Sequence, residues 1–180
     1  KTFISIVMLM VCALGNAQET YHPTAENLKA RKEFQDEKFG IFLHWGLYSM
    51  MGVGEWVMTN KDIHYKEYPK LAETFYPSAF DADEWVKEIK ASGAKYITIT
   101  TRHHDGFSLF KTATGKYNVV DGTPFKRDII KELADACHRH GIKLHLYYSH
   151  LDWGREDYPQ GRTGLGTGRP KEKANWASYY

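Results

Sequence analysis

Three short apolar runs recur along the chain, at residues 39–43, 94–101 and 142–148. The first is a continuous run of aromatic and branched side chains, which is typical of a strand buried on both faces of a parallel sheet, and we interpret the other two as buried strands as well. Between the runs, residues 81–92 and 124–140 place apolar side chains along one stripe at helical spacing, which predicts two amphipathic helices. The order strand, helix, strand, helix, strand predicts consecutive βαβ units.

Capping residues mark the ends of these two helices and the start of a third. Asp81 can cap the first amphipathic helix, and Gly141 can end the second. Residues 23–34, with Thr24 as N-cap, predict a polar surface helix. Residues 57–77 have no clean period, so we expect a long excursion with short helical pieces there.

Two architectures accept this order of elements: an open doubly wound sheet, or the opening of an eight-stranded barrel. The first turn between strand and helix carries no GxGxxG motif, and polar residues follow all three strands. These features favour a (β/α)8-like TIM barrel, of which the chain would hold about the first three βα units. Residues 161–170 are Gly-rich but lack the Lys-Ser/Thr ending of a phosphate loop, so we expect a surface loop there.

Residues 1–17 have the pattern of a secretory signal peptide: Lys1, an apolar run over residues 4–14 and small residues before the expected cut. The run is shorter than the ~20 apolar residues of a membrane span, and an uncleaved anchor is the less favoured alternative. We therefore expect export to a bacterial periplasm or the extracellular space. Residues 18–180 would then be the N-terminal part of a barrel domain.

Composition narrows the classes of function. The chain has 24 Lys and Arg against 22 Asp and Glu, a net charge of +2, which argues against nucleic-acid binding. Its 5 Trp and 12 Tyr suit stacking on sugars or packing a large core. Without the leader only Cys137 remains, so no disulfide can form within the chain, and Cys137 is expected to pack in the core.

Polar and aromatic residues follow every predicted strand. His44 follows the first, His103 and His104 the second, and Tyr147 lies at the end of the third. Buried imidazoles need hydrogen-bond partners and are poor core material. Because ligands bind at the carboxyl ends of parallel strands, we expect these residues to contribute to one site.

Several kinds of chemistry are compatible with these histidines. A metal site is disfavoured because neighbouring residues on a strand, such as His103 and His104, point to opposite faces. A metal-dependent hydrolase is therefore the least favoured alternative, and we expect neither metal nor cofactor. Any one histidine can instead have a structural role. No serine lies in a G-x-S-x-G elbow, which argues against a serine nucleophile.

Sugar recognition suits the same residue types, since imidazoles, carboxylates, phenols and indoles together satisfy a ring of hydroxyls. Glu55 and Trp56 add a carboxylate and an indole after the Gly-rich loop at residues 46–54. Cleavage with retention needs two carboxylic acids about 5–5.5 Å apart. Asp105 and Asp152 are available, but each can equally brace its own loop.

The chain contains five ordered motifs: FGIFLHWGLYS (39–49), GEW (54–56), TTRHHDGFSLF (100–110), KRD (126–128) and YYSHLDW (147–153). Together they resemble the α-L-fucosidases of glycoside hydrolase family 29, from about residue 19 to the end. The resemblance implies a (β/α)8-like barrel that removes terminal α-L-fucose from glycoconjugates or oligosaccharides, with retention and without a cofactor. A fucosylated glycan is the implied partner.

The resemblance also implies a fucose-binding set: His44, Glu55, Trp56, His103, His104 and Tyr147. The imidazoles and Glu55 would bind hydroxyls, Trp56 would contact an apolar part of the sugar, and Trp45 would support the pocket floor. The family's nucleophilic aspartate and acid/base carboxylate belong to later motifs, which do not occur before Tyr180. We therefore expect the binding half of a site without its catalytic pair, and a non-catalytic fucose-binding module is the alternative function.

Overall fold

The computed structural model describes residues 21–159 and 166–180, so the predicted signal peptide lies outside the described residues. The chain forms two compact units, Lys1–Asp36 and Glu37–Tyr180. In the first unit, α2 (Ala25–Glu37) buries none of its residues, and the Thr24 hydroxyl accepts a hydrogen bond from the Asn27 amide at 3.2 Å. The predicted polar helix is confirmed. None of the described helices is long and apolar enough to span a membrane.

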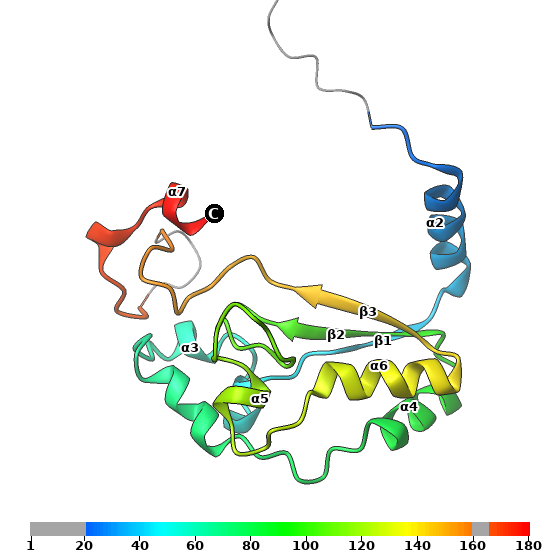
Figure 1. The fold of residues 1–180 in the computed structure, drawn as a ribbon, viewed down its shortest axis with the longest axis horizontal. Helices are drawn as coiled ribbons and strands as arrows, with labels where there is room; N and C mark the ends of the chain where they lie inside the picture. The colour runs from blue at the N-terminus through cyan, green and yellow to red at the C-terminus, as the bar shows by residue number, and fades with distance from the viewer. Residues whose placement is uncertain (1–20, 160–165) are drawn as a thin grey trace, which may run out of the picture. The chain divides into compact units, whose positions relative to one another are not determined.

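Three strands form the sheet of the second unit: β1 (Gly40–Leu43), β2 (Tyr96–Arg102) and β3 (Lys143–Tyr148). They are parallel and adjacent in chain order (Figure 1), as the sequence predicts. The register pairs Leu43 with Ile99 and Thr100 with Tyr147. All three strands therefore end at the same edge of the sheet.

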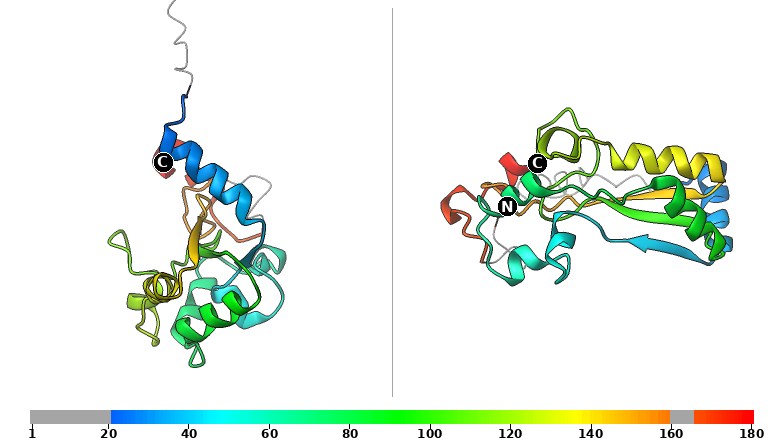
Figure 2. Two further views of the ribbon diagram at one scale, coloured as in Figure 1. Left: turned by 90° about the vertical axis from the view of Figure 1, so that its right-hand side faces the viewer. Right: turned by 90° about the horizontal axis from the view of Figure 1, so that it is seen from below.

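Two helices, α4 (Ala82–Ala91) and α6 (Ile129–His140), lie side by side on one face of the sheet (Figures 1 and 2). Asp81 caps α4 as predicted, because its carboxylate accepts hydrogen bonds from the Asp83 and Glu84 amides at 2.9 and 3.0 Å. Side chains of both helices and of β2 are fully buried between them: Val86, Ile97, Ile99, Ile129 and Leu133.

The second amphipathic helix begins five residues later than the sequence predicts. Lys126 has a left-handed backbone, with φ of 60°, which a continuous helix cannot contain. Asp128 then caps α6 by accepting a hydrogen bond from the Lys131 amide at 2.9 Å. The apolar stripe is continuous across this break, which is why spacing alone misplaces the start.

Burial of each strand on both faces is not what the structure shows. Phe42 of β1 is 51 % exposed, and Leu146 of the outer strand β3 is 57 % exposed. The described residues therefore form an α/β unit with three parallel strands and not a closed barrel. The apolar character of these strands exceeds what three strands and two helices can cover.

Short helical pieces gather at the carboxyl edge of the sheet (Figure 1). The predicted excursion after β1 contains α3 (Val57–Asn60) and η2 (Tyr68–Thr74), and the Gly-rich loop before it is shaped by η1 (Leu47–Met51). A further turn, α5 (Val119–Gly122), follows β2. After β3 come η3 (Lys171–Lys173) and α7 (Trp176–Tyr179).

The Thr100 hydroxyl joins β2 to the end of β1. It accepts a hydrogen bond from the Trp45 amide at 3.0 Å and also bonds the Trp45 carbonyl and the Tyr48 hydroxyl. Thr100→Val keeps the side-chain shape but leaves these buried groups unpaired, so we expect a loss of about 2 kcal/mol in unfolding free energy, measured by urea denaturation. Thr114→Val, in an exposed loop, should change it by less than about 0.5 kcal/mol. Equal losses would contradict this role.

Candidate functional site

Four of the predicted site residues form a ring cluster at the carboxyl edge of the sheet. The His103 ring centroid lies 5.6 Å from that of His44, 4.2 Å from that of His104 and 6.1 Å from that of Tyr147. His44 and Tyr147 are 6.2 Å apart. We call these four residues the imidazole cluster. Parallel pairing of the strands produces it, because the register brings three strand ends together.

Trp56 and Glu55 extend the imidazole cluster. The Trp56 ring meets that of His104 edge-on, with centroids 5.4 Å apart, and packs in the same way on Trp153 at 5.1 Å. The Glu55 carboxylate is close enough to His104 to act on its pKa. The structure thus brings together all six residues that the sequence predicts.

The two central histidines are neutral near pH 7. Burial, followed by the nearby His104 and His44, lowers the pKa of His103 to about 3. Burial also lowers the pKa of His104, although Glu55 opposes that shift. A neutral imidazole has one donor and one acceptor nitrogen, which is what a sugar hydroxyl can use. The cluster can therefore form several neutral hydrogen bonds with one ligand.

Tyr48 packs against His103 of the imidazole cluster, a contact that the sequence does not predict. Its ring lies 5.4 Å from that of His103, and its hydroxyl is 3.0 Å from the Thr100 hydroxyl. Burial raises the Tyr48 pKa well above its usual value, so the phenol stays protonated. The only sequence signal for Tyr48 is its place in the first motif, four residues after His44.

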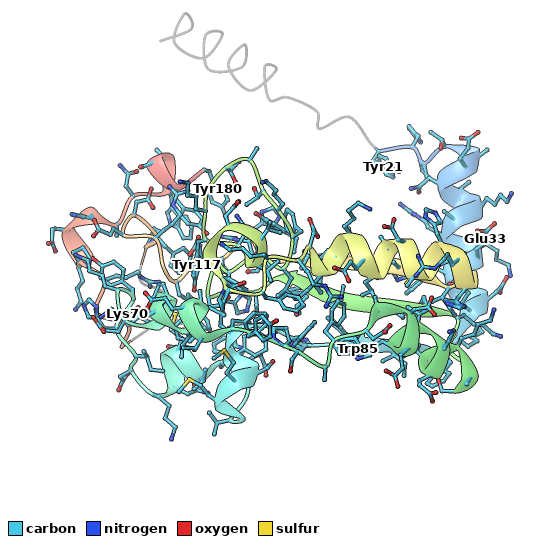
Figure 3. All side chains as sticks on the ribbon, turned by 60° about the horizontal axis from the view of Figure 1, so that its bottom comes forward. Tyr21, Glu33, Lys70, Trp85, Tyr117 and Tyr180 are labelled. Atoms are coloured by element: carbon cyan, nitrogen blue, oxygen red, sulfur yellow. The ribbon has the colours of Figure 1, made fainter. Side chains whose placement is uncertain are left out.

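Trp45 does not support the pocket floor, and that expectation is wrong. Its ring packs against Trp85 of α4 (labelled in Figure 3), at 4.9 Å, and against Phe80 at 5.2 Å. The Trp45 ring thus lies on the side of the helices and the His44 ring in the cluster, as alternation predicts. Trp45 therefore contributes to the core. His103 and His104 do not follow the alternation expected of them: both come after the end of β2, and both rings lie in the cluster.

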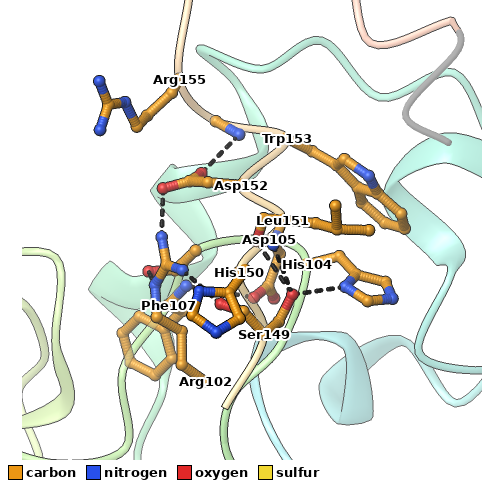
Figure 4. A network of polar contacts seen from close by, with 12 residues as sticks. Arg102, His104, Asp105, Phe107, Ser149, His150, Leu151, Asp152, Trp153 and Arg155 are labelled. Atoms are coloured by element: carbon orange, nitrogen blue, oxygen red, sulfur yellow. Dashed lines mark hydrogen bonds and ion pairs between the residues drawn. The ribbon is translucent and has the colours of Figure 1, made fainter. Parts of the chain in front are cut away.

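Asp105 and Asp152 brace their loops, which confirms the structural alternative for both. Asp105 is 2 % exposed and accepts hydrogen bonds from the Tyr68 hydroxyl at 2.9 Å and the Phe107 amide at 3.1 Å. Asp152 accepts from the Gly154 amide at 2.9 Å and forms an ion pair with Arg102 (Figure 4). Both carboxylates are occupied by contacts within the fold.

Two buried groups, Asp105 and His103, make the unfolding free energy depend on pH in opposite directions. Burial raises the pKa of Asp105 from 3.8 to about 6, so the native state holds a proton that the unfolded chain has lost, and stability falls as the pH rises through that range. The pKa of His103 falls from 6.5 to about 3, so the unfolded chain holds the extra proton and stability rises with pH between those values. In the native sequence the two slopes offset each other.

Asp105→Asn should leave only the pH dependence of the unfolding free energy that His103 causes. We expect the unfolding free energy of this variant to rise between about pH 4 and 6 by a few kcal/mol more than that of the native sequence, because ~1.4 kcal/mol accompanies each unit of pKa shift. His103→Gln should have the opposite effect and give a free energy that falls with pH. Urea denaturation at several pH values measures both. Parallel pH profiles in the native sequence and Asp105→Asn would contradict the assignment.

Metal ligation and thiol chemistry find no support in the described ranges. Among residues 21–159 and 166–180, no group of three or more His, Cys, Asp or Glu side chains could hold a metal ion. Cys137 is buried in α6, as predicted, and burial raises its pKa to about 11. What the site offers is neutral hydrogen bonding beside aromatic faces.

A comparison with models of known protein families shows to which family the chain belongs. The family profile described as Alpha-L-fucosidase matches residues 8–176. The chain belongs to the α-L-fucosidase family. The resemblance that the five motifs carry is thereby confirmed.

Curated relatives of this α-L-fucosidase family chain are longer than it is. It is 35% identical over 173 residues to plasma α-L-fucosidase of Rattus norvegicus. This alignment covers 84% of this chain and 37% of that protein. It is 37% identical over 154 residues to plasma α-L-fucosidase of Homo sapiens. This alignment covers 74% of this chain and 33% of that protein. The chain spans about a third of the length of these relatives.

Parts of solved α-L-fucosidases superpose on this chain. Isoenzyme 1 from Paenibacillus thiaminolyticus superposes with a TM-score of 0.74 at 38% identity, covering 82% of this chain and 36% of that one. AlfC from Lactobacillus casei, in complex with its α-L-fucose product, superposes with a TM-score of 0.73 at 36% identity, covering 82% and 53%. The three-stranded unit therefore matches part of a fucosidase.

Proposed function

We propose that the protein carrying this chain is an exo-acting, retaining α-L-fucosidase with a (β/α)8-like barrel, and that this stretch supplies its fucose-binding residues. The substrates would be glycoconjugates or oligosaccharides that end in α-L-fucose. The observation that carries the proposal is the convergence of His44, His103 and Tyr147 from three strand ends. The related AlfC has been solved in complex with its α-L-fucose product, which supports fucose as the ligand.

Five of the six predicted residues have a stated chemical role in this proposal. Neutral His103 and His104 exchange hydrogen bonds with sugar hydroxyls, and His44, which is exposed, reaches the ligand from the side of β1. The Glu55 carboxylate accepts hydroxyl protons, while the indole of Trp56 covers an apolar part of the deoxyhexose. No metal or cofactor takes part in these contacts.

The catalytic carboxylates would come from elsewhere in the protein. Asp105 is buried and bonded to Tyr68 and Phe107, and Asp152 is paired with Arg102. Neither can leave these contacts to attack a sugar without breaking the loop that it braces. We also propose that residues 1–17 direct export, on the strength of their apolar run and small-residue ending.

Titration calorimetry tests the binding role. L-fucose should give saturable heat with the protein that carries this chain, and its enantiomer D-fucose should give none. Release of nitrophenol from 4-nitrophenyl α-L-fucopyranoside tests catalysis on the same sample. Binding without release would favour the non-catalytic fucose-binding module, and a folded protein that gives no heat with L-fucose would refute both functions.

A further inference from the structure

Ser149 joins the loops that follow β2 and β3. It comes directly after β3 and is 4 % exposed. Its amide donates to the Arg102 carbonyl at 3.0 Å, and its carbonyl accepts from the Arg102 guanidinium at 2.9 Å. Arg102 immediately precedes the two histidines of the imidazole cluster. The Ser149 backbone is therefore fixed relative to His104.

The Ser149 hydroxyl makes three polar contacts with only one proton (Figure 4). It lies 2.7 Å from His104 Nδ1, accepts from the Leu151 amide at 3.0 Å, and lies 3.1 Å from the Leu151 carbonyl. The carbonyl can only accept, so the hydroxyl proton belongs on that contact. The contact between the Ser149 hydroxyl and His104 Nδ1 is then a hydrogen bond only if His104 carries its proton on Nδ1 and donates it to the hydroxyl oxygen.

We propose that Ser149 is a positioning residue that holds His104 as its Nδ1–H tautomer, so that Nε2 accepts a hydrogen bond from a sugar hydroxyl. This inference rests on the proposed function. The rings of Trp56 and Trp153, centred 5.4 and 5.1 Å from that of His104, limit its rotation. Burial keeps the imidazole neutral, as its lowered pKa indicates, so one nitrogen remains an acceptor.

His103 complements this arrangement. Its Nδ1 is buried and has no hydrogen-bond partner among the described residues. A buried acceptor without a partner costs less than a buried N–H without one, so His103 favours the Nε2–H tautomer. The two adjacent rings, 4.2 Å apart, then present one donor and one acceptor. Such a pair suits two neighbouring hydroxyls of one sugar, with opposite hydrogen-bond directions.

Nitrogen NMR of histidine tests the tautomer directly in the whole protein. With ¹⁵N-labelled histidine, and His104 assigned by comparison with His104→Gln, the native protein should show a protonated Nδ1 and a bare Nε2. Ser149→Ala should shift His104 toward the Nε2–H form and weaken L-fucose binding about tenfold, the worth of one ligand hydrogen bond. Ser108→Ala, which changes another buried serine in the loop after β2, should alter neither the spectrum nor the affinity.

The possible outcomes separate this inference from the function on which it rests. An Nε2–H tautomer in the native protein, with L-fucose binding intact, would overturn the role of Ser149 alone. Unchanged His104 signals and affinity in a folded Ser149→Ala would do the same. If Ser149→Ala does not fold, the tautomer in the native protein decides. A native protein that fails to bind L-fucose would instead overturn the proposed function.

Discussion

Replacing His103 with alanine should lower kcat/KM for 4-nitrophenyl α-L-fucopyranoside at least about a hundredfold, or about 3 kcal/mol, in the protein that carries this chain. His103 lies at the centre of the imidazole cluster and is 4 % exposed. A buried neutral imidazole is already oriented and desolvated before the sugar arrives, so its hydrogen bond contributes fully to binding the transition state. The loss should also appear as weaker binding of L-fucose in calorimetry.

A second variant separates this effect from loss of structure. His103→Ala leaves a space beneath His44 and Tyr147 and should lower stability as well as activity. His44→Ala removes an exposed ring of the same cluster, so it should weaken L-fucose binding while leaving the urea midpoint unchanged. His22→Ala, at an exposed position outside the sheet unit, is the matched control and should change neither. Native activity in a folded His103→Ala would refute the assigned role.

The fold could be predicted to the level of elements because local signals and packing agree. Strands β1, β2 and β3 are apolar runs bounded by polar residues, and Asp81 caps α4 where the sequence places it. The start of α6 could not be predicted, because the left-handed Lys126 interrupts a stripe that continues across it. Burial on both faces, which the apolar run of β1 predicts, does not hold for Phe42, because three strands and two helices leave its side of the sheet uncovered.

The clustering of His44, His103, His104 and Tyr147 could be predicted, because parallel strands bring their carboxyl ends to one edge of the sheet. The supporting residues could not be predicted. Ser149 lies within the YYSHLDW motif, but no sequence pattern connects it with His104, because their contact depends on how two loops meet. The resemblance implies that Trp45 supports the pocket floor, but its ring packs on Trp85 of α4.

Arg102→Met should cause the largest loss of stability, about 3–5 kcal/mol in unfolding free energy, because it leaves a buried carboxylate unpaired. The Arg102 and Asp152 side chains are each 13% exposed. Arg102 also donates to the carbonyls of Gly106 at 3.2 Å and Ser149 at 2.9 Å, so it holds the loop after β2 against the loop after β3. L-fucose affinity should fall with stability, because both loops carry residues that surround His104.

Further substitutions show whether the unpaired charge is the cause. Lys70→Met removes an ion pair whose side chains are 62% and 59% exposed, and should cost less than about 1 kcal/mol. Arg102→Met combined with Asp152→Asn should recover part of the loss, because asparagine can still accept from the Gly154 amide and carries no charge. Asparagine is also close to aspartate in size, so it fits in the same place against Gly106, where a Cβ would lie 2.5 Å from Asp152 Oδ1. If the double variant is no more stable than Arg102→Met, the lost carbonyl contacts, and not the unpaired carboxylate, account for the effect.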